Sequence, residues 1–322
     1  MSLQTRRVDT TRAVPLERNI ITIGENVIGT TKNFGVITGS PKSGKSRFIS
    51  AFLTAGITGI PQFSISVKID RGKTIGHFDT EQGETDILKS VSTVKTWCGM
   101  DQLPPGYDLF SCREDGPEEI CKMVDEYIEP GQCQLLILDG ILDMIIDYND
   151  IRESRIFMNW IKRITKKYDL FILAVIHLGK SEGNTLGHIG SMCDRYCQAV
   201  IGSEKETDGT YTLKPRLLRS APGFDPINIR YDGAVQMWLQ NDRIYEKPRI
   251  ILQEPKYMRS SDHADNLKLI FNGRGEIPYS ELLQSIIEIY GSPKAWAKLC
   301  VRHFIKDKFV TKSAITGNYY QG

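Results

Sequence analysis

Apolar runs alternate with amphipathic segments through the first 180 residues of the chain. Continuous apolar runs, typical of strands buried on both faces, are followed by segments with apolar residues at helical spacing. The expected strands are 34–39, 74–79, 107–112, 134–139 and 169–177, and the expected helices are 45–56, 82–97, 116–130 and 151–167. This alternation predicts an α/β fold whose mostly parallel sheet is covered by helices on both faces.

The pattern changes after residue 197, where apolar segments follow one another without helices between them. These segments are 199–203, 211–218 and 227–231, with turn signals at Asp208-Gly209 and Asp232-Gly233. We expect them to extend the sheet in antiparallel fashion, so that residues 20–243 form one domain.

Two stretches lack this regularity. Residues 1–19 are polar and basic, which predicts a flexible N-terminal arm. Residues 244–275 are charged and irregular and end in Asn272-Gly273-Arg274-Gly275, which predicts a linker.

Residues 276–322 are expected to form a separate small domain. A helix is predicted over 278–290, a second through about 306 after Gly291-Ser292-Pro293, and a hairpin between 309–310 and 319–320. This order is the outline of a winged helix. The second helix and the hairpin carry a basic face, which suits DNA phosphates: Lys294, Lys298, Arg302, Lys306, Lys308 and Lys312. The alternative is a packing or oligomer-contact domain whose basic face is simply solvated.

Composition adds limits to this picture. Because the net charge is only +2, any strongly basic surface must be confined to one part of the molecule. The seven cysteines form no C-x-x-C pair, which argues against a zinc site and for reduced thiols. There is no apolar run of transmembrane length, and the first residues lack the apolar core of a signal peptide. We therefore expect a soluble cytoplasmic protein with no membrane partner.

The sequence GSPKSGKS follows the apolar run 34–38 and precedes an expected helix. Its pattern, G-x-x-x-x-G-K-S, lets backbone N–H groups and the positive end of the helix face a polyphosphate. Lys45 is expected on the β- and γ-phosphates, and the Ser46 hydroxyl on Mg²⁺. The predicted ATP contacts are Gly39, Ser40, Pro41, Lys42, Ser43, Gly44, Lys45, Ser46 and Arg47.

Hydrolysis requires further groups. Asp139 ends an apolar strand, where a Mg²⁺-side carboxylate is expected, but the next residue is Gly140 and not an acid. Glu81, after the expected strand 74–79, is the best source of a carboxylate that orients or deprotonates water. The alternative for Glu81 is an acid that opens a helix. His177 is a candidate phosphate sensor or a structural strand-end histidine.

At these motifs the chain resembles the hexameric RecA/DnaB-like ATPases, and among them the compact RepA-type replicative helicases of plasmids and mobile elements. The matching segments are GSPKSGKS, FDTEQ, LLILDG, VIHLGK and LKPRLLRSAPGFDP. The resemblance implies a RecA-like core with Glu81 as the base, Asp139 as the metal-side acid and His177 as the sensor.

The resemblance also implies contributions that depend on assembly. A neighbouring subunit would supply a cation, for which Arg219 fits best, with Arg216 and Lys214 behind it. A homo-oligomer, expected to be a hexamer, would hold single-stranded DNA in a channel lined by residues 141–153 and 180–190, where Lys180 meets phosphate.

The sequence thus predicts an ATP-hydrolysing motor acting on DNA, a replicative helicase-type protein of a plasmid or mobile element. An ATP-dependent DNA-binding regulator or loader without unwinding activity is the alternative. A small-molecule kinase would need an arginine-rich lid, which 180–190 does not provide.

Overall fold

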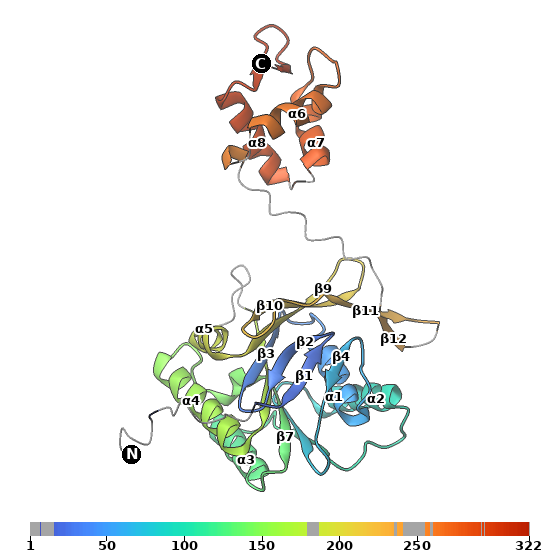
Figure 1. The fold of residues 1–322 in the computed structure, drawn as a ribbon, viewed down its shortest axis with the longest axis vertical. Helices are drawn as coiled ribbons and strands as arrows, with labels where there is room; N and C mark the ends of the chain where they lie inside the picture. Colours follow the sequence, from blue (N-terminus) through green and yellow to red (C-terminus); the bar gives the residue numbers. More distant parts are fainter. Residues whose placement is uncertain are drawn as a thin grey trace. The chain divides into compact units, whose positions relative to one another are not determined.

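The computed structural model describes residues 7, 16–178, 187–234, 237–240, 255–257, 260–290, 292 and 294–321. The chain divides into two compact units, Met1–Asp242 and Arg243–Gly322 (Figure 1). None of the helices within the described ranges is long and apolar enough to cross a membrane.

A nine-stranded sheet forms the centre of the first unit, in the order β12-β11-β10-β9-β3-β8-β7-β5-β6. Neighbouring strands run parallel from β9 through β3, β8, β7 and β5 to β6. Strands β10, β11 and β12 pair with their neighbours in antiparallel fashion. The α/β prediction and the antiparallel extension are therefore confirmed. The strands are β3 (Phe34–Gly39), β5 (Thr74–Asp79), β6 (Tyr107–Ser111), β7 (Cys133–Asp139), β8 (Phe171–His177), β9 (Ala199–Lys205), β10 (Tyr211–Leu218), β11 (Ile227–Asp232) and β12 (Met237–Gln240).

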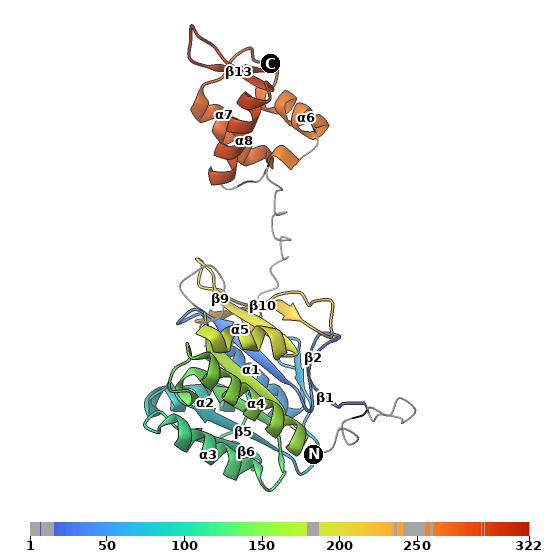
Figure 2. The same ribbon diagram turned by 90° about the vertical axis from the view of Figure 1, so that its left-hand side faces the viewer.

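Helices cover both faces of this sheet (Figures 1 and 2). One face packs against α1 (Lys45–Thr58) and α2 (Glu84–Cys98), and the other against α3 (Pro117–Ile128), α4 (Ile151–Tyr168) and α5 (Gly187–Tyr196). Alternate residues of β7 separate accordingly: Leu135 and Ile137 belong to the first core, Leu136 and Leu138 to the second. A strand covered on both sides has no polar face, which explains its continuous apolar sequence.

A smaller antiparallel sheet, β2-β1-β4, packs into the same core as α1. It consists of β1 (Asn19–Ile23), β2 (Asn26–Thr30) and β4 (Ile65–Val67). A Cβ atom on Gly29 would lie 2.5 Å from the Phe171 ring, so this position requires glycine for close packing. The pattern of apolar residues did not predict this sheet.

The second unit contains α6 (Ser260–Phe271), α7 (Tyr279–Tyr290), α8 (Lys294–Lys306) and the hairpin β13 (Val310–Lys312) and β14 (Tyr319–Gln321), preceded by the short turn η3 (Pro255–Tyr257). The predicted linker, 244–275, thus includes a helix. Leu267, Ile270 and Phe271 of α6 are buried in the same core as Phe304. Their i, i+3, i+4 spacing indicates a helix, but the charged residues around them obscured it.

Candidate active site

The phosphate loop joins the end of β3 to the start of α1. Gly44 precedes the helix with φ of 96° and supplies no side-chain cap, so the first N–H groups of α1 are available to an anion. A Cβ on Gly39 would lie 2.4 Å from the Ser203 carbonyl oxygen, and one on Gly44 would lie 2.3 Å from the Tyr211 ring. Close contacts therefore require glycine at both positions, and the positive φ of Gly44 favours glycine there as well.

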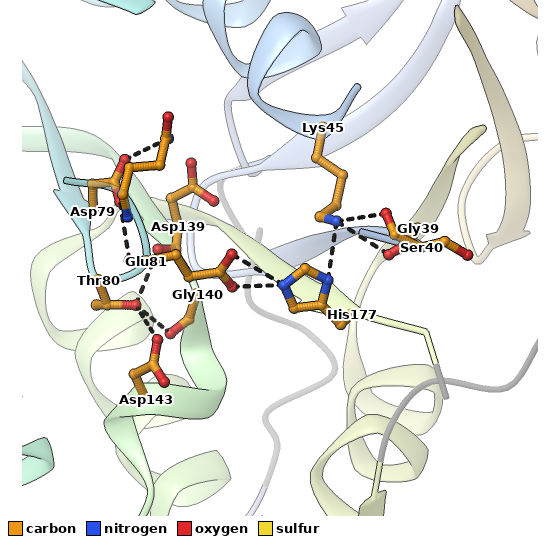
Figure 3. Close-up of polar contacts among 11 residues, drawn as sticks. Gly39, Ser40, Lys45, Asp79, Thr80, Glu81, Asp139, Gly140, Asp143 and His177 are labelled. Atoms are coloured by element: carbon orange, nitrogen blue, oxygen red, sulfur yellow. Dashed lines mark hydrogen bonds and ion pairs between the residues drawn. The ribbon is translucent and has the colours of Figure 1, made fainter. Parts of the chain in front are cut away.

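Lys45 is buried beneath the loop and contacts three acceptors. Its Nζ lies 3.1 Å from the carbonyl oxygens of Gly39 and Ser40 and 3.1 Å from Nδ1 of His177 (Figure 3). Burial lowers the pKa of Lys45, and the negative charges of Glu81 and Asp139 oppose that shift. The ammonium group thus lies against loop carbonyls at the position from which it can reach a phosphate.

His177 connects Lys45 to Glu81. The register of β3 and β8 places His177 opposite Gly39. Because an ammonium group only donates, His177 Nδ1 accepts from Lys45, and the ring proton is on Nε2. Nε2 lies 3.0 Å from both carboxylate oxygens of Glu81. Three residues predicted separately therefore form one hydrogen-bonded chain.

The environment of Glu81 favours the charged carboxylate. Burial alone would raise the pKa of Glu81, but the hydrogen bond from His177 and the ammonium of Lys45 hold that pKa below its usual value. A carboxylate that stays ionised and accepts hydrogen bonds is suited to orient a water molecule.

The backbone conformation and the close neighbours of residue 140 explain why a glycine, and not an acid, follows Asp139. Its φ is 110°, and a Cβ there would lie 2.3 Å from Thr80 Oγ1 and 2.8 Å from Glu81 Cγ. Thr80 Oγ1 also lies 2.9 Å from the Gly140 carbonyl oxygen and from Asp143 Oδ2. The side chains of residues 80 and 81 thus occupy the space that a larger residue 140 would need.

The residues present fit a Mg²⁺ ion beside the loop. Asp139 and the half-buried Ser46 line the same small cavity beneath α1, and both offer the hard oxygen ligands that Mg²⁺ prefers. Asp79 lies beside Asp139, and both burial and the Asp139 charge raise the pKa of Asp79. Asp79 accepts hydrogen bonds from the backbone N–H groups of Glu81 and Gln82, at 3.1 and 2.8 Å, and so fixes the turn that carries Glu81.

Arg47, in the first turn of α1, packs against two aromatic rings that also contact each other edge to face. Its guanidinium carbon is 4.5 Å from the ring centroids of both Tyr211 and Trp238. Cation–π contacts of this kind fix the direction of the side chain. Sequence reasoning included Arg47 among the loop residues but missed its partners, because β10 and β12 are far away in the chain.

One stretch of the chain is similar to a known protein family. Residues 25–183, just under half of the chain, match the family model described as an AAA domain. This segment is therefore similar to the AAA domain family. No curated protein matches the chain significantly. Among solved structures, the crystal structure of the RadB recombinase matches with a TM-score of 0.46 and 13% sequence identity, covering 63% of this chain and 88% of that one.

Arg219 lies away from the phosphate loop of its own molecule. Strand pairing places Leu218 beside Ala199, and Ala199 beside Gly35, at the amino end of β3, whereas the loop begins at its carboxyl end. Arg219 is exposed, and its Nη2 donates to the Arg195 carbonyl oxygen at 2.7 Å. The structure therefore does not bring Arg219 to the Lys45–His177–Glu81 chain of the same molecule.

The other predicted cations have different positions. The side chain of Arg216 packs against β9. A Cβ on Gly202 of that strand would lie 2.9 Å from Cδ of Arg216. Lys214 forms an ion pair with Glu204. Lys180 lies outside the described residues, so its predicted DNA contact has no structural description.

Four of the six predicted basic residues of the second unit lie on helix α8. Lys294, Lys298 and Arg302 of α8 are exposed and follow one another at four-residue spacing, whereas Ala297, Val301 and Phe304 are buried. Lys306 continues the row and is also exposed. We refer to Lys294, Lys298, Arg302 and Lys306 as the α8 stripe.

Proposed function

We propose that this protein is a RecA-like motor that hydrolyses ATP and acts on DNA, of the replicative helicase type found in plasmids and mobile elements. The single observation that carries the proposal is the chain from Lys45 through His177 to Glu81. It links the cation of the phosphate loop to a carboxylate that is kept ionised at the tip of β5. A protein that only holds a nucleotide has no need of such a carboxylate.

In the proposed mechanism, Lys45 exchanges the Gly39 and Ser40 carbonyls for the β- and γ-phosphate oxygens of ATP. Ser46 and Asp139 would hold Mg²⁺, which supplies positive charge to the phosphates. Glu81 orients the attacking water and accepts its proton. Because His177 bonds both Lys45 and Glu81, a change at the γ-phosphate alters the position of the carboxylate.

We further propose that a neighbouring subunit completes the site. Arg219 is exposed at the amino edge of the sheet, where it can serve a second copy of the chain. A cation delivered across the contact would neutralise charge on the transferred phosphoryl group. A hexameric ring is the assembly that this proposal favours, with single-stranded DNA in its channel.

The second unit supports a role on DNA. We propose that it is a winged-helix domain whose α8 stripe contacts phosphates. Four exposed cations at four-residue spacing form a row along one side of a helix, which suits the regular charge of a nucleic-acid backbone.

The test is steady-state ATPase activity of the full chain with and without single-stranded DNA, across a protein dilution series. The proposal expects activity that rises with both DNA and protein concentration. A forked duplex tests unwinding in the same samples. Hydrolysis stimulated by DNA without strand separation would instead support the regulator or loader, and activity indifferent to DNA would contradict the motor.

A further inference from the structure

Three buried side chains meet beneath the phosphate loop, beside the Lys45–His177–Glu81 chain. His77 and Asp79 lie on β5, and Asp139 lies on the adjacent strand β7. Their exposed fractions are 5%, 1% and 4%, respectively. One ligand atom from each lies within 4.8 Å of the others. Two carboxylates enclosed together call for a positive charge between them.

Two atoms of this cluster lack hydrogen-bond partners within the described part of the chain. They are Nε2 of His77 and Oδ2 of Asp139, which lie 3.8 Å apart and face each other. This separation exceeds a hydrogen bond, yet it suits two ligands of one metal ion bonded at about 2.1 Å to each. Two ligands of such an ion lie at most about 4.2 Å apart, so the third atom needs to shift by only some tenths of an ångström.

The other ring nitrogen of His77 is already held. Nδ1 lies 3.1 Å from the Tyr107 hydroxyl. A histidine that binds a metal through one nitrogen commonly donates from the other to a fixed oxygen, which sets the tautomer and the ring orientation. With the proton on Nδ1 and donated to Tyr107, the Nε2 lone pair points toward Asp139.

The space beside the cluster is enclosed and small. A cavity of about 10 Å³, the room needed by one water molecule or ion, is lined by His77, Asp79 and Asp139, and by Ser46 and Tyr107. Apolar side chains of α1 and α2 line the rest of this cavity, which is too small for an organic ligand.

We propose that His77, Asp79 and Asp139 form a binding site for a divalent transition-metal ion, which the protein binds in the absence of nucleotide. One imidazole and two carboxylates favour Mn²⁺ or Zn²⁺ over Mg²⁺, which prefers an all-oxygen shell rich in water. The ion neutralises the two enclosed carboxylates and links the tips of β5 and β7. This site is independent of the proposed motor function, although it shares Asp139 with the predicted Mg²⁺ site.

The test uses Mn²⁺ and the full chain, freed of metal and nucleotide. Electron paramagnetic resonance should detect one bound Mn²⁺ per chain, with a nitrogen hyperfine coupling that changes when the protein is made with [¹⁵N]histidine. Zn²⁺ should displace the Mn²⁺, whereas an equal concentration of Mg²⁺ should not. The His77→Gln variant should lose the coupling and bind Mn²⁺ at least about 10-fold more weakly, since loss of even a ligand's hydrogen-bond partner weakens metal binding by about 10- to 100-fold.

Two controls separate this site from other possibilities. His188→Gln removes an exposed histidine outside the cluster and should leave the coupling unchanged. Lys45→Ala should abolish hydrolysis but retain Mn²⁺, so that failure of the metal site and failure of the motor proposal remain distinguishable.

The proposal is overturned if the wild-type protein shows no nitrogen coupling. The space would then hold a water molecule, or an ion bound by carboxylates without His77. Mg²⁺ competing as well as Zn²⁺, or His77→Gln binding Mn²⁺ like the wild type, would also overturn it. If His77→Gln does not fold, the test rests on two other results. These are the nitrogen coupling in the wild-type protein and the loss of Mn²⁺ binding in Asp79→Asn.

Discussion

Glu81 shows how two opposing effects set the charge of one side chain. Burial favours its neutral form, whereas His177 and Lys45 favour the carboxylate and outweigh burial, so the pKa is lowered. The same two contacts connect the carboxylate to the phosphate loop. Removing the charge of Glu81 while keeping its shape therefore tests both its proposed chemistry and its effect on stability.

For the chemistry, we expect Glu81→Gln to reduce ATP hydrolysis by about 10²- to 10⁴-fold, the usual contribution of a general base. ATP binding should persist, because the glutamine amide does not contact the loop glycines or replace Lys45. Steady-state hydrolysis and equilibrium binding of a fluorescent ATP analogue measure the two effects separately. Hydrolysis at the wild-type rate would remove Glu81 from the mechanism.

For stability, the lowered pKa of Glu81 gives a definite sign. The folded state binds the proton of Glu81 less readily than the unfolded state, whose pKa is near the ordinary 4.5. The carboxylate thus stabilises the folded protein above that pH, and this stabilisation disappears as the pH falls through the lower folded pKa. Urea unfolding between about pH 3 and pH 7 should show a free-energy gap between wild type and Glu81→Gln at neutral pH that closes in acid. A gap independent of pH would show that the charge is not its source.

At the scale of elements, the junction between β7 and η2 (Ile141–Met144) controls the position of the turn after β5. Gly140 ends β7 with a positive φ, and Thr80 and Glu81 fill the space beside it. The two strand ends are therefore packed together, and neither turn can change its conformation alone.

We expect Gly140→Ala to destabilise the protein by more than the roughly 1–3 kcal/mol of a strained backbone position and to lower hydrolysis by displacing Glu81. Gly209→Ala is the matched control, because Gly209 also has a positive φ, of 85°, but nothing within 4 Å of a Cβ. Thermal unfolding and ATPase assays of both variants separate two effects. Gly209→Ala introduces backbone strain alone, whereas Gly140→Ala adds a steric clash with Thr80 and Glu81. Equal effects in the two variants would contradict the packing argument.

Elements with a complete local signal were predictable from sequence. The two-sided apolar run of β7 and the helical spacing of α4 needed no information about distant residues. The positions of Lys45, Glu81 and His177 were predictable because each lies at or shortly after the end of a recognisable strand. Nothing in the sequence placed Trp238 beside Arg47, or His77 beside Asp139, because these contacts depend on strand order. The short strands β1 and β4 carry too few residues to show a period.

At the scale of the whole molecule, the position of Arg219 separates it from its own phosphate loop by the length of β3. An arginine in this position contributes to hydrolysis only if another copy of the chain is present. The proposed assembly is therefore testable without determining its size.

We expect Glu81→Gln and Arg219→Ala to be nearly inactive alone and to regain part of the ATPase activity when mixed. In a mixed assembly, an Arg219→Ala subunit retains Glu81 and can receive Arg219 from a Glu81→Gln neighbour. Steady-state hydrolysis at a fixed total protein concentration and varied ratio measures the recovery. Mixtures as inactive as their components would indicate that Arg219 does not act between subunits.

For the α8 stripe, we expect Lys298→Ala to weaken DNA binding and to reduce the slope of log K against log salt by about 1, the change for one lost phosphate contact. Lys268→Ala is the control, because Lys268 is exposed on α6 and already paired with Asp265 at 2.9 Å. Fluorescence anisotropy with labelled duplex and single-stranded DNA over a salt series provides the slopes. An unchanged slope for Lys298→Ala would favour a solvated face that does not bind DNA.

The contact of Gly140 with Thr80 and Glu81 also bears on how related sequences can vary. Because one space cannot hold two side chains, a carboxylate following β7 and a bulky pair following β5 exclude each other. A relative with glutamate at the position of Gly140 should carry smaller residues at the positions of Thr80 and Glu81. The source of the catalytic carboxylate would then pass from one strand to the other through paired substitutions, and an aligned family of such chains should show these positions covarying.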